Sequence, residues 1–569
     1  MVYNWGSMKG RLLACASTML LGGAMAGAAT AAEFEWGDVT VDIDSTVNIG
    51  VGIRTVNPDA RYIAASNGGT NRSVAAENVD DGNQNFLRGD IYSASTRAIH
   101  DVEISLGNVG AFTRFSYFYD AVKNDADSTR RTDLSDAARR RAGRGIDVLD
   151  AYVYGDFEVM DMPLAVRLGN QAINWGEALY RSGGIAQTNA IDVIKLETPG
   201  AEVREAFLPS PMAWASIAIT PELSLEGYYQ FQWRQSRLVP VGTFLSGEDL
   251  FGPGAEGFFL AGDPGGTGLP ASALLAAPTG VRKAGDERPN DQGQWGVAAR
   301  YYAEGISSEF GLYYLNYHAK TPYVGASASR VVLVPAFPPF IPFPITADLT
   351  DNYFASFPED IDLYGATATF PLGDISIGVE ASYQPDYPVP IDGLSAATTA
   401  VGLAGGGAAR SYGFARMDRL STIANAHVSI GPGMPVFGAI TEAMGADAID
   451  IVGEAGLVDF QGALPTGASG DNFSWGYNLT ASAPFSRAFG TDITLTPSVD
   501  FRHDVNGLSI DRAVTSNYVE NRRGITLGLE ASYEADLAAK IAYTNNMGGG
   551  TNSAKSDRDY VTFTVSYAF

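Results

Sequence analysis

The chain has 569 residues, of which 18% are charged and 11% aromatic, and it carries 65 glycines and a net charge of −26. So acidic a chain is a poor partner for nucleic acid, and its mean hydropathy of −0.02 is too polar for a bundle of membrane helices. Abundant glycine and aromatic residues at near-neutral hydropathy instead suit strands with one apolar and one polar face.

The N-terminus has the pattern of an export signal. Lys9 and Arg11 precede an apolar, alanine-rich stretch that runs from Leu12 to Ala29 and ends among small residues suited to cleavage. We therefore expect residues 1–32 to be a signal peptide and residues 33–569 to form one domain. A membrane anchor is the alternative.

The mature chain has neither cysteine nor a helix pattern that could span a membrane. The single cysteine, Cys15, lies in the expected signal peptide, which excludes disulfides, cysteine metal sites and thiol nucleophiles. No uninterrupted apolar run long enough to span a bilayer as a helix follows the signal. Two of the 38 basic residues and none of the 64 acidic residues lie in residues 1–32, so the mature net charge would be −28.

Period-two alternation of apolar and polar residues begins directly after the expected signal peptide. Residues 39–54 are the first example, and the pattern recurs at 225–234, 375–384 and 525–534. Successive side chains of a strand lie on opposite faces, so each segment predicts a strand with one apolar and one polar face. Many such segments are about ten residues long, the length that a tilted strand needs to cross a bilayer.

The complete pattern predicts eighteen strands, or sixteen if the weakest pair, at 412–430 and 447–455, is dropped. In chain order we expect strands near 38–54, 88–106, 111–120, 147–157, 164–171, 211–219, 223–234, 294–303, 308–318, 361–370, 375–384, 412–430, 447–455, 473–483, 491–503, 524–534, 538–546 and 559–569.

The connections between these segments alternate between tight turns and long loops. This arrangement is expected of an outer-membrane barrel with short periplasmic turns, long extracellular loops and both termini in the periplasm. Lipid cannot satisfy the backbone groups of an open sheet edge, so the first and last strands must pair. We therefore expect an all-β fold, a transmembrane antiparallel β-barrel of 16–18 strands with 18 favoured, wide enough for an aqueous lumen.

The last predicted strand alternates cleanly and ends the chain on an aromatic residue. Phe563, Tyr567 and Phe569 share its apolar face. A terminal amphipathic strand of this kind resembles the assembly signal of bacterial outer-membrane barrels, which the barrel-assembly machinery would read. The alternative is a soluble sandwich that ends in such a strand by chance.

The most distinctive block, residues 164–234, resembles an outer-membrane family catalogued as "domain of unknown function 1302". The shared features are Arg167-Leu168-Gly169-Asn170-Gln171, Asn174-Trp175-Gly176-Glu177, Gly184-Ile185, Asn189 to Asp192, Pro199-Gly200-Ala201-Glu202, Leu208-Pro209, Glu226 to Trp233, Gly445-Ala446-Asp447 and Gly453-Glu454. Ala190 departs from the pattern, which has a proline there.

The resemblance covers most of the mature chain and implies a barrel. It also implies uptake or handling of hydrophobic compounds such as lipids or steroids, beside a companion periplasmic protein and an inner-membrane transporter. The motif does not set which solute is carried.

Residues 172–210 occupy one of the long outer connections and combine aromatic and charged residues. Such a loop can fold back into the lumen and narrow it, and opposed Arg and Glu side chains across a narrow passage would sort solutes. The alternative is that Trp175 and Gly176 pack the loop against the wall. Candidate passage residues, including those on flanking strands, are Arg167, Gln171, Asn174, Trp175, Glu177, Tyr180, Arg181, Glu202, Glu205, Gln230, Gln232 and Arg234.

Three other loop features are open to two interpretations each. The proline-rich apolar stretch 331–345 could capture hydrophobic solutes, or form a small core of its own or touch lipopolysaccharide. Six arginines within 130–144 could bind lipopolysaccharide phosphates, or pair with neighbouring aspartates in a solvated loop. Residues 80–85 carry oxygen ligands suited to calcium but lack the full twelve-residue ligand pattern, so we expect no metal site.

Enzyme chemistry finds little support in the sequence. No Gly-x-Ser-x-Gly motif occurs, and the four histidines, at 100, 318, 427 and 503, are widely separated. We expect a channel in the outer membrane of a Gram-negative bacterium, surrounded by lipid and lipopolysaccharide and without a cofactor. It would take up a small hydrophobic solute passively through a barrel narrowed by an infolded loop. The alternatives are a general or acid-selective porin, a lipid hydrolase or acyltransferase, and a structural surface protein.

Overall fold

A computed structural model describes residues 32–73, 76, 78–125, 128–259, 280–334, 345–404, 408–511, 517–534 and 536–569 of the chain. Almost all of the expected signal peptide, most of the apolar stretch 331–345 and the stretch 260–279 lie outside the described residues. The description below therefore concerns the barrel and most of its connections.

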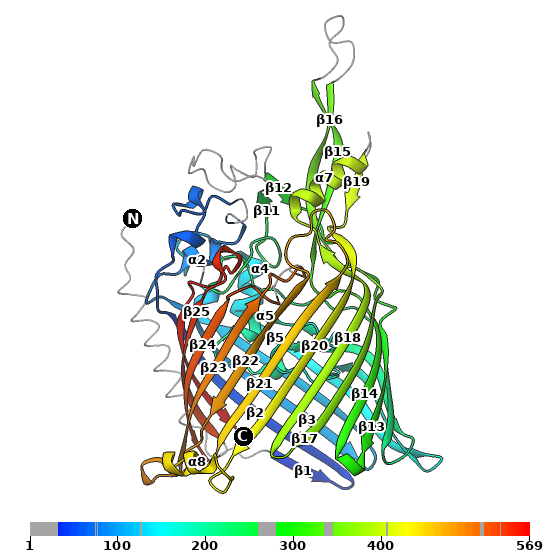
Figure 1. The fold of residues 1–569 in the computed structure, drawn as a ribbon, viewed down its shortest axis with the longest axis vertical. Coiled ribbons are helices and arrows are strands. Elements are labelled where there is room, and N and C mark those ends of the chain that lie inside the picture. The colour runs from blue at the N-terminus through cyan, green and yellow to red at the C-terminus, as the bar shows by residue number, and fades with distance from the viewer. Residues whose placement is uncertain are drawn as a thin grey trace, which may run out of the picture.

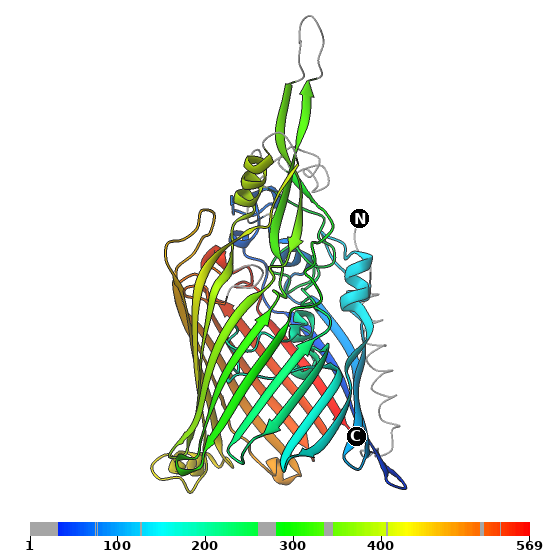
Figure 2. The same ribbon diagram turned by 90° about the vertical axis from the view of Figure 1, so that its right-hand side faces the viewer.

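Eighteen antiparallel strands form a closed barrel (Figures 1 and 2). In chain order they are β2 (Val39–Arg54), β3 (Ile91–Leu106), β4 (Val109–Asp120), β5 (Arg144–Val159), β6 (Met162–Gln171), β9 (Ser210–Ala218), β10 (Leu223–Gln230), β13 (Trp295–Ala303), β14 (Ser308–Tyr317), β17 (Ile361–Leu372), β18 (Ile375–Pro390), β20 (Phe414–Ile430), β21 (Ile449–Gln461), β22 (Phe473–Ser482), β23 (Ile493–Asn506), β24 (Arg523–Tyr533), β25 (Leu537–Met547) and β26 (Tyr560–Ala568).

The first and last strands close the barrel. β2 and β26 pair antiparallel, with Val51 opposite Phe563 and Val47 opposite Tyr567. The chain end completes the ladder, because Phe569 N donates to Ser45 O at 2.8 Å and Ser45 N donates to Phe569 O at 2.7 Å. The prediction of eighteen strands is confirmed, and the sixteen-strand alternative is wrong because the whole of β21 pairs with residues 418–430 of β20.

Smaller elements lie outside the barrel wall. β1 (Ala32–Trp36) forms a hairpin with the start of β2. A second sheet, which stands above the barrel mouth, joins β11 (Gly257–Phe259), β12 (Gly280–Lys283), β15 (Tyr323–Val334), β16 (Ile345–Ser356) and β19 (Ala409–Ser411). The α-helices are α2 (Asp81–Asn85), α3 (Ala121–Asn124), α4 (Asp136–Ala138), α5 (Val193–Leu196), α7 (Gly393–Ala404) and α8 (Gly438–Met444).

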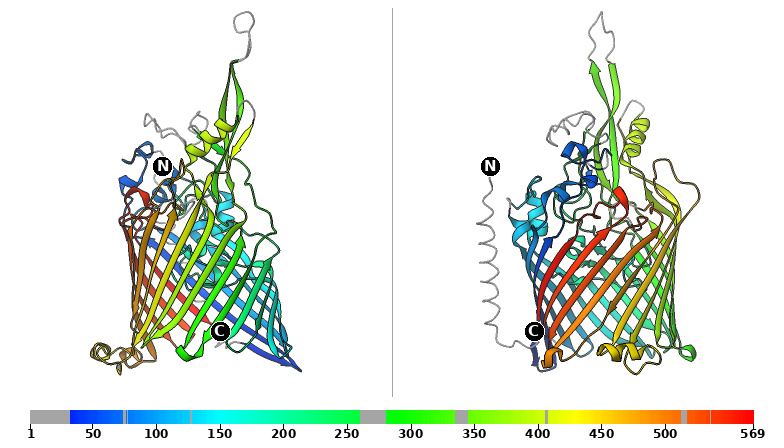
Figure 3. Two further views of the ribbon diagram at one scale, coloured as in Figure 1. Left: turned by 45° about the vertical axis from the view of Figure 1, so that its right-hand side comes forward. Right: turned by 60° about the vertical axis from the view of Figure 1, so that its left-hand side comes forward.

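The two ends of the barrel differ. The long connections and the β15–β16 hairpin gather at one end, the loop side, and the C-terminus lies at the other, the turn side (Figures 1 and 3). Two connections on the turn side depart from the short-turn pattern: residues 431–448 carry α8, and residues 483–492 carry a 3-10 turn at Ala488–Gly490. No helix of the described chain has both the length and the apolarity to traverse a bilayer.

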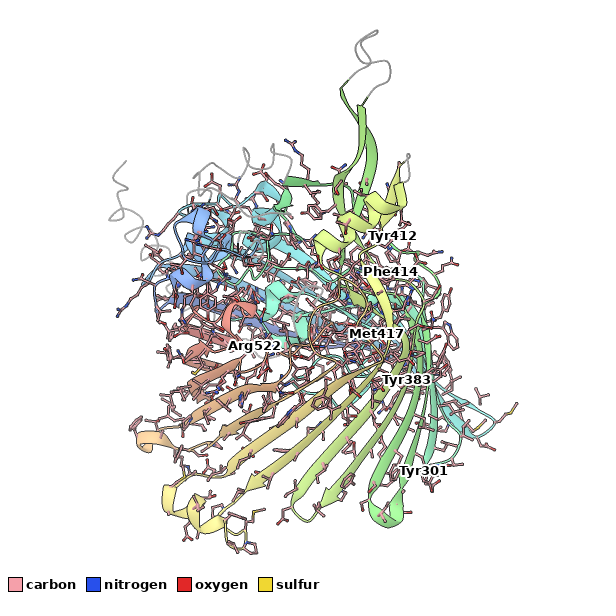
Figure 4. The ribbon with its side chains drawn as sticks, turned by 45° about the horizontal axis from the view of Figure 1, so that its top comes forward. Tyr301, Tyr383, Tyr412, Phe414, Met417 and Arg522 are labelled. Atoms are coloured by element: carbon pink, nitrogen blue, oxygen red, sulfur yellow. The ribbon has the colours of Figure 1, made fainter. Side chains whose placement is uncertain are left out.

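The outer surface of the barrel carries a band of exposed apolar side chains. Leu312, on β14, is 66% exposed, and Val297 and Leu527 are exposed in the same outward phase of their strands. Aromatic residues border this band, with Tyr301 near the turn side and Tyr383 nearer the loop side (Figure 4). An apolar band between two aromatic girdles is the surface that a barrel presents to lipid.

The band leads to a prediction about substitutions at the middle of β24. Leu527→Arg is expected to lower the free energy of unfolding by about 2–4 kcal/mol, because an arginine near the bilayer midplane loses its hydration. Thr526→Arg, one residue away and in the inward phase, should cost much less. Urea unfolding of the barrel in lipid vesicles measures both, and equal costs would contradict the assignment of the outer face.

Candidate functional site

One connection, residues 172–209 between β6 and β9, is bonded to several strands of the barrel wall; we call it the anchored segment. It contains the short pair β7 (Ala190–Ile191) and β8 (Phe207–Leu208), the helix α5 and a 3-10 turn at Val203–Glu205. Asp192 caps α5 by accepting a hydrogen bond from Ile194 N at 3.1 Å.

Two buried glutamates of the barrel wall hold the first part of the anchored segment. Glu380, on β18, accepts hydrogen bonds from the backbone of Glu177 at 2.6 Å and Ile185 at 3.1 Å. Glu454, on β21, accepts three from successive backbone N–H groups, those of Leu179, Tyr180 and Arg181, at 2.5, 2.9 and 2.6 Å. Both carboxylates belong to the inward phase of their strands and are almost fully buried. They replace the water that these N–H groups would otherwise bind.

Arg181 ties the same part of the segment to β23. Its Nη1 donates to Asp504 Oδ1 at 2.6 Å, and both side chains are buried. Asp504 also accepts from Arg522 Nε at 2.6 Å and from Val519 N at 3.2 Å. A buried carboxylate shared in this way is fully hydrogen-bonded, which is the condition under which a buried charge is tolerated.

Trp175 packs the segment against the inner wall. Its Nε1 donates to Glu226 Oε2 at 2.9 Å, and its ring lies 5.1 Å from Tyr228 and 5.7 Å from Tyr313, centroid to centroid. The indole is 2% exposed and belongs to a buried apolar cluster with Ile185. Trp175 therefore fixes the segment, as the packing interpretation expects, and has almost no surface for a solute.

Ion pairs hold the second part of the segment to the opposite wall. Arg97, on β3, bonds Glu205 at 2.8 Å with both side chains buried, and Lys195 lies 3.3 Å from Asp147 on β5. Arg204 bonds Asp101 of β3 at 2.8 Å. β3 and β18 are separated by nine strand pairings in a ring of 18, so they face each other across the barrel.

The predicted passage residues divide into two groups by exposure. Those that are buried and hold the segment or wall together are Gln171, Trp175, Arg181, Glu205 and Gln230. Those with accessible surface are Arg167, Asn174, Glu177, Tyr180, Glu202, Gln232 and Arg234. Arg167 lies over the rings of Trp214 and Tyr152, and Glu202 bonds Arg204 at 2.6 Å and Asn48 at 3.1 Å.

Two of these residues are not on a strand. β10 ends at Gln230, so Gln232 and Arg234 lie beyond it, and the prediction of a strand to residue 234 is too long. The reason is Trp233, which continues the alternation in the sequence but is buried in the structure, where its Nε1 donates to Ala319 O at 3.1 Å within an apolar cluster.

Sequence reasoning missed the apolar surface of the anchored segment. Leu179, Leu196, Val203 and Phe207 are exposed on it, Val203 to 68%. An exposed apolar side chain in the mouth of a barrel is available to a solute. The signal was present as isolated aliphatic residues among turn residues, but no period could distinguish them from residues of a loop core.

A cleft rich in arginine lies on the loop side, beyond the ends of β9 and β10. It has a volume of about 440 Å³ and is lined by Arg141, Arg234, Arg237, Lys283 and Arg288, and Asp286 is the one acidic residue among the described residues that line it. Arg237 bonds Asp147 at 2.7 Å and Asp192 at 3.1 Å, and Lys283 pairs with Asp286. Burial, and next the charge of Arg237, lower the pKa of Arg141 and of Arg234.

The arginine run at 130–144 is only partly paired with the aspartates expected from the sequence. Arg139 pairs with Asp136, whereas Arg130 bonds Asp90 at 2.9 Å, a residue of the preceding loop. Arg141 contributes to the cleft instead. The run therefore joins neighbouring loops as well as facing solvent.

Comparisons with known proteins give one family and no curated relative. The family model described as "Protein of unknown function (DUF1302)" matches residues 12–569. No curated protein matches the chain.

Solved structures with a related arrangement share little sequence with the chain. Pseudomonas aeruginosa OpdK with vanillate is 10% identical over 93% of this chain and 98% of that one, with a TM-score of 0.38. Acinetobacter baumannii OccAB3 is 8% identical over 93% and 99%, with a TM-score of 0.40. Salmonella typhi OmpF in complex with daunomycin is 9% identical over 95% and 100%, with a TM-score of 0.36. Likeness at this level carries no argument about this chain.

Proposed function

Because the chain belongs to the family described as "Protein of unknown function (DUF1302)" and folds as a closed barrel of 18 strands, we propose that it is an outer-membrane channel. Small solutes pass through it passively, and the anchored segment narrows the lumen. The apolar outer band between aromatic girdles supports the membrane location.

One observation carries the proposal. The anchored segment is bonded to Glu380 of β18 and to Arg97 of β3, on opposite sides of the ring. A segment tied to both walls divides the lumen, so a solute must pass beside it. Charged groups beside the path of the solute, among them Arg204 and Asp101, would provide the transverse electric field that sorts solutes by charge.

The solute is proposed to have an apolar body. The support is the exposed apolar surface of the anchored segment at Leu179, Leu196, Val203 and Phe207. Apolar contacts of this kind favour entry of hydrophobic compounds from dilute solution, because each contact removes apolar surface from water. The buried bonds of the segment keep this surface in place.

A double substitution tests the apolar passage. Leu196→Asp with Val203→Asp is expected to slow entry of a small apolar solute into proteoliposomes about tenfold, the ratio that corresponds to ~1.4 kcal/mol of lost contact. Val436→Asp, an exposed turn-side residue, is the matched control and should leave entry unchanged. Unchanged entry in the double variant, with entry of a sugar also unchanged, would contradict the apolar passage.

A second candidate, an acid-selective channel, is favoured by the arginine cleft. In the described part of the chain, Arg141, Arg234 and Arg288 line it without an ion-pair partner, which makes the loop side locally positive on an acidic protein. Entry rates of an acid and its amide of equal size distinguish the two candidates. A strong preference for the acid indicates the second, and indifference to charge with a preference for apolar bodies indicates the first.

The proposal extends to partners of the channel. Lipid and lipopolysaccharide would surround the barrel, and the barrel-assembly machinery would recognise the terminal strand through Phe563, Tyr567 and Phe569. A periplasmic companion and an inner-membrane transporter would receive the solute. Support for the terminal-strand role is that β26 completes the barrel by pairing with β2.

A further inference from the structure

Three carboxylates from two different loops meet at the barrel mouth. Asp80 and Asp81 lie in the connection 55–90, and Asp249 lies in the connection 231–294. A carboxylate oxygen from each residue lies within 4.8 Å of the others. A backbone hydrogen bond also joins the two connections, because Asp249 N donates to Asn78 O at 2.8 Å.

Asp249 is buried and incompletely bonded. It is 8% exposed, and among the described residues its Oδ1 has no hydrogen-bond partner. Its Oδ2 receives only the N–H of Asp81, at 3.4 Å. A buried carboxylate oxygen without a donor is costly, which indicates that the group is built for a partner of another kind.

Asp80 is held rigidly in the same place. It is fully buried, its Oδ2 accepts from Ala64 N at 2.9 Å, and both of its oxygens lie near Asn67 Nδ2 at 3.0 and 3.1 Å. Two rigid supports of this kind fix the direction of the carboxylate, as supporting hydrogen bonds do for metal ligands. The loop side therefore holds a prearranged set of oxygen ligands.

Two arginines close to the three carboxylates donate their hydrogen bonds to other groups. Arg558 and Arg131 face the group, but among the described residues neither forms an ion pair with it. Arg558 donates to Phe244 O at 2.7 Å, and Arg131 to Gln84 Oε1 at 2.6 Å.

We propose that Asp80, Asp81 and Asp249 bind one divalent cation of the calcium class and so join the connection 55–90 to the connection 231–294. Calcium takes carboxylate oxygens in flexible geometry, whereas magnesium demands near-ideal octahedral sites and keeps its waters. The sequence analysis expected no metal because residues 80–85 lack the full calcium-loop pattern, and the third ligand, Asp249, lies 168 residues from Asp81. This inference is independent of the proposed function: the calcium site can be disproved while the proposed channel function stands.

Calorimetric titration tests the site directly. Calcium chloride is titrated into the purified full-length barrel in detergent after EDTA treatment and dialysis, at neutral pH. Wild type is expected to bind one calcium ion per chain. Asp249→Asn, which keeps the size of the side chain, should weaken binding about tenfold or more, because calcium affinity follows the charge of the ligand set. Asp81→Asn should act in the same direction.

The control and the second readout keep the test decisive. Asp59→Asn alters a carboxylate of the same loop that is bonded to Arg61 at 2.6 Å, and it should bind calcium as wild type does. Calcium should also protect the connection 231–294 from proteolysis in wild type and not in Asp249→Asn, while both retain barrel conductance. The proposal is overturned if wild type binds no calcium, if Asp249→Asn binds it equally well, or if magnesium competes at equal concentration.

Discussion

Replacing Glu454 by alanine is expected to raise the single-channel conductance, because three successive N–H groups of the anchored segment lose their shared acceptor. Each lost bond costs ~1 kcal/mol, so the total is ~3 kcal/mol. About 1.4 kcal/mol corresponds to a tenfold change in an equilibrium constant, so the undocked fraction of the segment should rise about a hundredfold. Planar-bilayer recordings should then show frequent steps to a wider state.

Two companions of this variant separate a local effect from a general one. Glu454→Gln retains one acceptor oxygen and should lie between alanine and wild type. Glu530→Ala removes another inward-phase glutamate, on β24, which bonds no part of the anchored segment in the described structure. Its conductance should equal that of wild type, and an equal rise in both alanine variants would refute the anchoring role of Glu454.

Asp504→Ala is expected to have the largest effect on stability, a loss of about 3–5 kcal/mol in the free energy of unfolding. The substitution removes the carboxylate that Arg181 and Arg522 both bind at 2.6 Å and leaves the buried guanidinium of Arg181 unpaired. Asp504→Asn should cost less, since the amide oxygen still accepts a hydrogen bond.

Urea unfolding in lipid vesicles, followed by tryptophan fluorescence, measures this loss. Asp500→Ala is the control, because it lies on the same strand and face and accepts one bond from Thr480 Oγ1 at 2.7 Å. It should cost ~1 kcal/mol. If the two alanine variants unfold at the same urea concentration, the buried ion pair of Asp504 contributes no more to stability than the single hydrogen bond of Asp500.

The strands were predictable because a barrel wall imposes a simple pattern on sequence. Each wall residue faces either lipid or the interior, so alternation repeats from β2 to β26 without any need for long-range information. β20 and β21 were the weakest prediction because the turn between them carries α8 and looks unlike the other turns. The overlong prediction for β10 shows the limit, since Trp233 keeps the alternation in sequence but leaves the wall.

The site was predictable as a segment and not as a set of contacts. Residue types located the connection 172–210, yet nothing in the sequence distinguishes Trp175, which is packed away, from Tyr180, which is accessible. The acceptors Glu380 and Glu454 are ordinary inward-phase residues until their partners are known. Leu196 and Val203 were missed because an irregular loop has no period from which exposure can be inferred.

The sequence by itself determined the wall: a closed antiparallel barrel follows from alternating strands, alternating connection lengths and the need to satisfy every backbone group in lipid. Only the tertiary structure decided what lies inside and above the wall. Arg181 bonds Asp504, which lies 323 residues away in the sequence, and Asp81 bonds Asp249, which lies 168 residues away. Local alternation fixes which face a side chain takes, but which distant side chain it meets depends on the course of the loops, and that course has no repeating pattern.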